Sequence, residues 1–136
     1  MTSRREARRA AIQILYQADL TGEEPDAVLA GRGALEAIPS FARELVEGVD
    51  GLLPQVDLIL EEHAEGWSVA RMPAVDRAIL RVAVYELMAR PDVPRAAAIN
   101  EAVEAANELS TEDSGRFVNG VLGRIARELP PSEGAS

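Results

Sequence analysis

The sequence predicts an all-helical protein, and three observations support this fold class. Apolar residues recur at spacings of three and four along most of the chain, which is the period of an amphipathic helix. Hydrophobic residues make up 47% of the 136 residues but aromatic residues only 4%, a balance typical of aliphatic helical cores. Between Pro73 and Pro91, apolar side chains spread around most of the helical circumference, so we expect a central helix with neighbours on several sides. The length suits one compact domain, or two small helical halves that share a core.

The composition argues against several classes of site. The absence of cysteine removes disulfides, thiolate metal sites and cysteine nucleophiles. No apolar run approaches the length of a membrane span, and the basic N-terminus lacks the apolar core of a signal peptide, so we expect a cytoplasmic protein with no membrane partner. No glycine-rich phosphate loop, HExxH or GxSxG motif is present, and no acidic pair stands out as a general acid and base. The sequence therefore indicates a binding module rather than an enzyme, with no cofactor and no metal.

Charge is distributed unevenly along the chain. The formal net charge is −9, which argues against nucleic-acid binding through the whole surface. The first nine residues nevertheless contain a cluster of arginines, which we call the arginine arm: Arg4, Arg5, Arg8 and Arg9. A basic arm on an acidic body suggests two partners of different kinds.

The arginine arm lies in the first predicted helix, from Arg4 to about Leu20. Ser3 and Glu6 fit a capping box at its start. Helical geometry places Arg5 and Arg9 on one stripe with Tyr16, and Arg8 beside it. On such a face guanidinium groups can hold phosphates while the ring stacks on an exposed base. A solvated basic turn followed by a tyrosine at the edge of the core explains the same pattern, so both interpretations stay open.

The middle of the first half is less regular. Residues 23–39 predict a short helix and a loose loop, and a strong amphipathic pattern then starts at Ser40, its expected N-cap. Gly51 and Pro54 interrupt this pattern, which predicts either a kink or two consecutive helices. His63 is the only histidine, and we expect it at the surface or at a helix end because no second metal ligand lies near it in sequence.

The central helix and its approach carry the next informative residues. We place an internal boundary at Gly66 and Trp67, and we expect Trp67 to fill space between two halves of the chain. A charge on a mostly buried helix must be paired or must reach the surface. Internal ion pairs with a solvated edge are about as plausible here as contacts to a partner. The polar residues in question are Asp76, Arg77, Arg81, Tyr85 and Glu86.

An acidic face marks the helix predicted at about 99–109. Its apolar residues form a clean amphipathic pattern, while Glu101, Glu104 and Glu108 lie on the other side. We call these three residues the carboxylate row. This face is expected to be solvated unless a basic partner covers it.

The last helix is expected from about Gly115 to Leu129. Gly120 and Gly123 line up on one of its faces with arginines, where the close approach of another helix or of a ligand would explain the missing side chains. Prolines end this helix, and residues 131–136 are expected to be a disordered tail.

Three separated segments together resemble one family, the NusB transcription antitermination factors. They are Arg4–Arg9 leading to Tyr16, then Val75–Leu87, and finally Ile99–Val103 with Glu112–Leu122. The resemblance extends from about Ser3 to Leu129. It implies an all-α fold of about seven helices in two three-helix-bundle-like halves that share a core. In that fold residues 1–136 form a single domain, with an N-terminal half at about 1–66 and a C-terminal half at about 67–130.

The resemblance also implies a function. Proteins of this family bind the boxA element of ribosomal RNA leader transcripts as a heterodimer with a ribosomal protein of the small subunit, called NusE in this role. They join RNA polymerase with other Nus factors and support processive transcription of ribosomal RNA operons. Asp76, Arg77 and Leu80 would contact the ribosomal protein, with Asp76 pairing with one of its basic residues. The residues carried over as RNA contacts are Arg4, Arg5, Arg8, Arg9, Tyr16, Asp113 and Phe117.

Two other hypotheses compete with this one. The same helical module resembles the N-terminal domain of bacterial ribosomal RNA cytosine-5 methyltransferases, but those enzymes need a Rossmann-like domain and cysteine chemistry. This sequence has no cysteine and is short for such an enzyme. A protein-only helical adaptor without specific RNA binding stays open as the alternative. Some family members form homodimers that hide the RNA surface, and the sequence does not decide between monomer and homodimer.

Overall fold

The structure, a computed structural model, describes residues 3–130 and contains only helices over this range. The all-α prediction is therefore confirmed for the described residues. None of their helices is long and apolar enough to cross a membrane. The elements are α1 (Arg4–Thr21), α2 (Pro25–Gly33), α3 (Ser40–Gly51), α4 (Leu53–His63), the 3₁₀ helix η1 (Val69–Arg71), α5 (Ala74–Ala89), α6 (Arg95–Leu109) and α7 (Glu112–Glu128).

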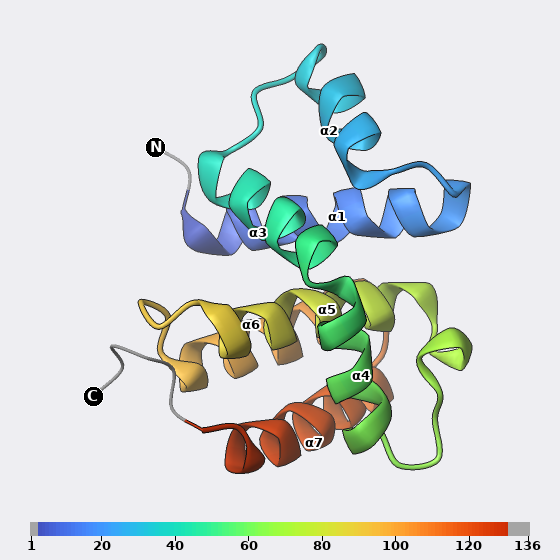
Figure 1. The fold of residues 1–136 in the computed structure, drawn as a ribbon, viewed down its shortest axis with the longest axis vertical. Helices are drawn as coiled ribbons and strands as arrows, with labels where there is room; N and C mark the ends of the chain where they lie inside the picture. The colour runs from blue at the N-terminus through green and yellow to red at the C-terminus, as the bar shows by residue number, and fades with distance from the viewer. Residues whose placement is uncertain (1–2, 131–136) are drawn as a thin grey trace.

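Helix α5 is the centre of the fold. It packs against α1, α3, α4, α6 and α7, as the apolar residues around its circumference predict (Figure 1). Ile79, Leu80 and Val84 are almost completely buried, and they belong to one cluster of buried side chains to which every α-helix contributes. The two groups of helices therefore share a single core.

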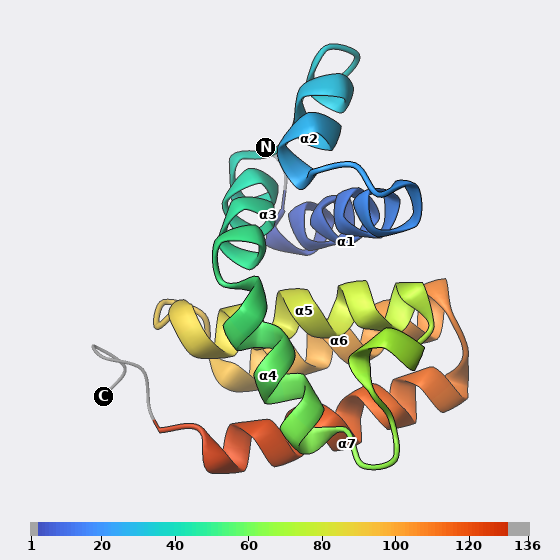
Figure 2. The same cartoon turned by 45° about the vertical axis from the view of Figure 1, so that its right-hand side comes forward.

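The two groups divide at a different point from the predicted one. Figures 1 and 2 show α1, α2 and α3 on one side and α4, α5, α6 and α7 on the other. Helix α4 was expected in the first half, but it packs against α5 and α7. The reason is the break at Gly51–Leu52, which ends α3 and lets the chain turn into the second group. Whether all 136 residues form a single domain stays a prediction, and the predicted disordered tail lies outside the described residues.

Trp67 does not fill the space between the halves. Its residue surface is 47% exposed, and its ring packs at 6.1 Å between centroids against Phe117 of α7. Gly66 precedes it with a φ of 78°, a left-handed conformation that favours glycine and turns the chain after α4. The tryptophan thus covers the outer side of the second group.

The helix ends show which sequence signals were correct. Ser3 caps α1 by accepting a hydrogen bond from the backbone N–H of Glu6, as predicted. Ser40 is not an N-cap, because Pro39 occupies that position and α3 starts at Ser40 itself. Helix α7 begins three residues before the predicted Gly115, because Thr111 accepts from the Ser114 N–H and so caps the helix at Glu112.

Close approach occurs at two glycines other than the pair predicted. A Cβ at Gly48 would overlap the ring of Tyr85, and a Cβ at Gly115 would overlap the side chain of Asn107. By contrast, the nearest atoms to a Cβ at Gly120 and at Gly123 are guanidinium nitrogens 3.6 Å away, which belong to arginines of α7 itself. Of the two explanations considered for Gly120 and Gly123, the close approach of another helix is therefore wrong among the described residues.

The contact between Gly48 and Tyr85 predicts a stability difference between two glycines of α3. Gly48→Ala forces the tyrosine ring to move, and it should lower the free energy of unfolding by about 1–3 kcal/mol. Gly51→Ala is the matched control, because nothing lies within 4 Å of a Cβ there and alanine favours a helix. Urea unfolding of both variants provides the comparison. Equal stabilities would show that the ring does not occupy the space over Gly48.

His63 joins the end of α4 to the end of α7. Its Nδ1 lies 2.7 Å from the carbonyl oxygen of Ile59, and its Nε2 contacts the carboxylate of Glu128. Both ring nitrogens face acceptors, so only the doubly protonated imidazolium can donate to both. Burial lowers the pKa of His63, but the bonds to Ile59 and Glu128 outweigh burial and the net shift is upward. The histidine does lie at a helix end, but it is buried rather than at the surface.

The pairing of His63 with Glu128 predicts a pH-dependent stability. A pKa that is raised on folding stabilises the protein fully below the unfolded value of about 6.5, and this stabilisation is lost as the pH rises through the folded pKa. The melting temperature of the wild type should therefore exceed that of His63→Gln most at pH 5.5, and the gap should narrow by pH 8.5. Glu128→Gln should reduce this dependence. A constant gap across the series would contradict the assignment.

Candidate functional site

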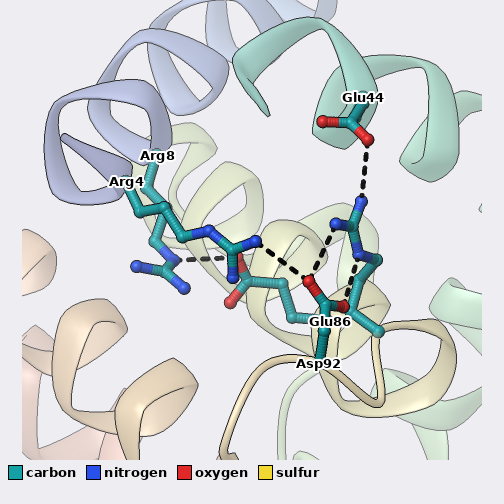
Figure 3. Close-up of polar contacts among 6 residues, drawn as sticks. Arg4, Arg8, Glu44, Glu86 and Asp92 are labelled. Atoms are coloured by element: carbon teal, nitrogen blue, oxygen red, sulfur yellow. Dashed lines mark hydrogen bonds and ion pairs between the residues drawn. The ribbon is translucent and has the colours of Figure 1, made fainter. Parts of the chain in front are cut away.

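The arginine arm is anchored by a buried ion pair. Arg8 donates from Nε to Glu86 Oε1 of α5 at 2.8 Å, and the two side chains are 9% and 1% exposed (Figure 3). Burial raises the pKa of Glu86, and the hydrogen bond and charge of Arg8 oppose that shift. The second carboxylate oxygen of Glu86 has no hydrogen-bond partner. Arg8 is thus turned into the protein rather than toward a ligand.

Arg4 belongs to a neighbouring surface cluster. It donates to Asp92 at 2.9 Å, and Asp92 also accepts from Arg90, which reaches Glu44 of α3 (Figure 3). The bonds from Arg90 and then Arg4 hold the pKa of Asp92 well below its usual range. The guanidinium groups of Arg4, Arg8 and Arg90 also lie 4.4, 5.5 and 5.2 Å from the centre of the Phe41 ring. The start of α1 is therefore held to α3, to α5 and to the loop after α5.

Arg5 and Arg9 contact the carboxylate row of α6. Arg5 pairs with Glu104 and, at 2.8 Å, with Glu108, while Arg9 donates to Glu108 at 3.2 Å. The hydrogen bond to Glu104 raises the pKa of Arg5, and the hydrogen bond from Arg9 lowers the pKa of Glu108. The row was expected to be solvated unless a basic partner covers it. The chain's own arginines are that partner.

The remaining predicted RNA contacts lie outside the arginine arm. Tyr16 is half-buried and packs against the core. Asp113, at the start of α7, is 86% exposed at its side chain and pairs with Arg116 of the same helix. Phe117 is half-buried and faces Trp67. The structure therefore divides the predicted RNA residues between the arginine arm, the first turn of α7 and an aromatic pair formed by Trp67 and Phe117.

Trp67 was not predicted as an RNA contact, although it lies beside Phe117. An exposed tryptophan beside a second ring offers an apolar surface on which a base can stack. Its position in the sequence could have predicted this exposure. Trp67 directly follows Gly66 in a segment without helical periodicity, where a large aromatic side chain need not be buried.

The predicted partner residues on α5 are more enclosed than expected. Asp76 is 3% exposed and accepts a 3.0 Å hydrogen bond from Ser114 of α7, and Leu80 is completely buried. The expectation that Asp76 is an exposed charge is wrong, because its position on α5 faces the start of α7. Arg77 donates to Asp19 at 2.8 Å and to the carbonyl groups of Val69, Ala70 and Met72. Its guanidinium group thus connects the end of α1 to the segment before α5.

An acidic groove lies beside these residues. It encloses about 230 Å³ between the end of α1, the start of α2 and the junction of α3 with α4. Arg81 forms one wall and is held by two 2.9 Å hydrogen bonds to Asp57. Four carboxylates line the groove as well, namely Asp19, Glu23, Glu24 and Asp50, and its floor is apolar, formed by Leu15, Ala18, Pro25, Val49 and Leu53. The sequence did not predict this groove, because its residues come from five different helices and from the segment after α1.

The buried position of Asp76 predicts the effect of reversing its charge. Asp76→Arg places a long cation against Ser114 in the interior and should destabilise the protein by roughly 3–5 kcal/mol. Asp76→Asn is the matched control, because it keeps the shape and an oxygen that accepts from Ser114. Chemical unfolding measures both. A folded Asp76→Arg protein of wild-type stability would show that the side chain lies at the surface.

The chain is similar to known proteins over most of its length. Residues 5–127 match the model of the NusB family. A relative from Saccharopolyspora erythraea, called transcription antitermination protein NusB, is 54% identical over 93% of this chain and 88% of its own length. The structure of T. maritima NusB superimposes with a TM-score of 0.86 at 36% identity, covering 96% of this chain and 94% of that one.

A second solved structure adds a complex. It contains the antitermination factors NusB and NusE with double-stranded RNA, and the matched chain has a TM-score of 0.83 at 29% identity, covering 93% of this chain and 97% of that one. The family model, the relatives and the solved structures agree over nearly the whole chain. This chain belongs to the NusB family.

Proposed function

We propose that this protein is a transcription antitermination factor that binds boxA RNA of ribosomal RNA leader transcripts together with ribosomal protein NusE. Its family supports the antitermination role, and a related NusB has been solved with NusE and RNA. In this role it acts in the cytoplasm, as a binding subunit without catalysis or cofactor, and joins RNA polymerase with other Nus factors.

The observation that carries the RNA proposal is the exposure of the arginine arm. The side chains of Arg4 and Arg5 are 49% and 48% exposed, so their guanidinium groups can reach an RNA strand without unfolding of α1. Arg9 is more enclosed, and Arg8 acts through its pair with Glu86 by fixing the arm. We therefore assign direct contact to Arg4, Arg5 and Arg9, and a positioning role to Arg8. Tyr16 supports the same helix from the core side.

Asp113 and the aromatic pair provide a second group of proposed contacts. The carboxylate of Asp113 is exposed at the start of α7 and can accept hydrogen bonds from a base. Phe117 and Trp67 present adjoining rings at an angle of 60°, which suits a base that stacks on one ring and touches the other. A strand that reaches from the arm to this pair would gain both charge and stacking contacts.

The proposed contact with NusE lies where α5 begins. Arg77 is the least buried member of the predicted set, with its side chain 15% exposed, and its partner Asp19 also lines the acidic groove. Asp76 and Leu80 would support this surface from beneath, through α7 and the core. A ribosomal protein is expected to be basic, and the four carboxylates of the groove match that charge.

One observation favours the protein-only adaptor as the second candidate. Every arginine of the arm already has a carboxylate partner within the chain. An arm that serves only to hold α1 in place would show the same ion pairs. The two candidates differ in whether the chain distinguishes boxA RNA from another RNA of equal length.

The test is binding to boxA RNA and to a scrambled RNA of equal length, with and without NusE at fixed salt. We expect selective binding that NusE tightens. Arg5→Ala with Arg9→Ala should weaken boxA binding by about tenfold or more, because two charged contacts are lost.

The matched control for the arm is Arg32→Ala with Arg43→Ala, since the ion pairs of these arginines, with Glu36 and Glu47, lie away from the arm. Arg32 also donates to Gln17 of α1 at 3.1 Å, so thermal unfolding must show that this variant is folded. This control should stay within about twofold of the wild type. Equal binding to both RNAs in every condition would favour the protein-only adaptor.

A further inference from the structure

The surroundings of the arginine arm leave it with no excess of positive charge. Five guanidinium groups face five carboxylates in the ion pairs that connect α1, α3, α5, α6 and the loop after α5. The arginines are Arg4, Arg5, Arg8, Arg9 and Arg90, and the carboxylates are Glu44, Glu86, Asp92, Glu104 and Glu108. The whole chain carries a net charge of −9. An arbitrary polyanion is therefore not attracted to this surface by charge alone.

The carboxylate row differs from the buried pair in how easily it can be displaced. The side chains of Glu104 and Glu108 are 50% and 51% exposed, and water screens their attraction to Arg5. Glu86 is 1% exposed and loses its hydrogen-bonded ion-pair partner if Arg8 moves away. An incoming phosphate can thus replace Glu104 and Glu108 on Arg5 and Arg9 at low cost, while Arg8 keeps the helix in place.

The contacts of the row are also incomplete. Arg9 Nη2 and Glu101 Oε2 are buried without a hydrogen-bond partner, although Arg9 Nη1 reaches the Glu101 backbone carbonyl oxygen. A row that served only to fasten α1 to α6 would be expected to satisfy these atoms. The pairing between the arm and this row is therefore incomplete.

We infer that Glu104 and Glu108 are selectivity determinants of RNA binding, because they occupy Arg5 and Arg9 in place of phosphate. An RNA displaces them only when contacts to its bases add to the phosphate contacts. An RNA that offers phosphates alone must exchange one anion for another and gains little. This inference rests on the proposed RNA-binding function, and it adds the acidic face of α6 to that site.

The test compares the wild type with a double variant that carries both Glu104→Gln and Glu108→Gln. Glutamine keeps the size of each side chain but releases both arginines from their anions. Affinity for a scrambled RNA should rise by about tenfold and affinity for boxA RNA by less, so the ratio of the two affinities falls. Two additional free arginines should steepen the dependence of log affinity on log salt by about 1.4, at roughly 0.7 per single-strand contact.

The matched control is Glu36→Gln with Glu47→Gln. These exposed glutamates also pair with arginines, but they lie on the segment after α2 and on α3. Their substitution changes the net charge by the same amount as the α6 double variant. The inference requires the control to keep the wild-type selectivity and salt dependence. Thermal unfolding of both double variants establishes that they are folded.

The outcomes separate this inference from the proposed function. If the wild type selects boxA and the α6 variant behaves like the control, the inference is overturned and the function stands. If the wild type selects boxA and the α6 variant gains affinity for the scrambled RNA, so that its selectivity falls, the inference is supported. If neither protein binds either RNA, both the inference and the RNA-binding function fail.

Discussion

The buried ion pair between Arg8 and Glu86 is the constraint on which the functional surface depends. It fastens the first turns of α1 to the central helix α5, at a place where loss of either partner leaves a charge without compensation. Because α1 is fixed there, Arg4 and Arg5 project from a rigid helix rather than from a flexible tail. Arg5 and Arg9 are at the same time set over α6. One arginine of the arm thus positions the others.

Charge in this protein is arranged so that most of it is already paired. The arginine arm meets the carboxylate row and Asp92, and Arg77 and Arg81 meet Asp19 and Asp57. The net charge that remains is negative, and Glu23, Glu24 and Asp50 contribute part of it in the groove beside α1 and α2. Such an arrangement suits a protein that must attract one basic partner while admitting an acidic one only through specific contacts. The arginine arm is thus neutralised within the chain, while the groove stays acidic.

Helical periodicity and the resemblance to the NusB family together were enough to predict the all-α fold, the central position of α5 and the cap at Ser3. The contacts between helices were harder to predict, because they depend on which helix faces pack together. The spacing of Asp76 shows a polar residue on a buried helix, but not that Ser114 faces it. The carboxylate row was expected to be solvated, because the sequence does not show that α1 lies against it. Trp67 looked like a core residue by type, and only the turn at Gly66 places it outside.

The central claim is that Arg8 holds the arm while Arg5 and Arg9 exchange their carboxylates for RNA. The most direct measurement is an NMR titration with boxA RNA that follows the side-chain Nε–Hε signals of these three arginines. The account predicts that the signals of Arg5 and Arg9 shift on binding, while the Arg8 signal, bonded to Glu86, stays in place. A large shift of Arg8, or unchanged Arg5 and Arg9 signals in a bound complex, would contradict it.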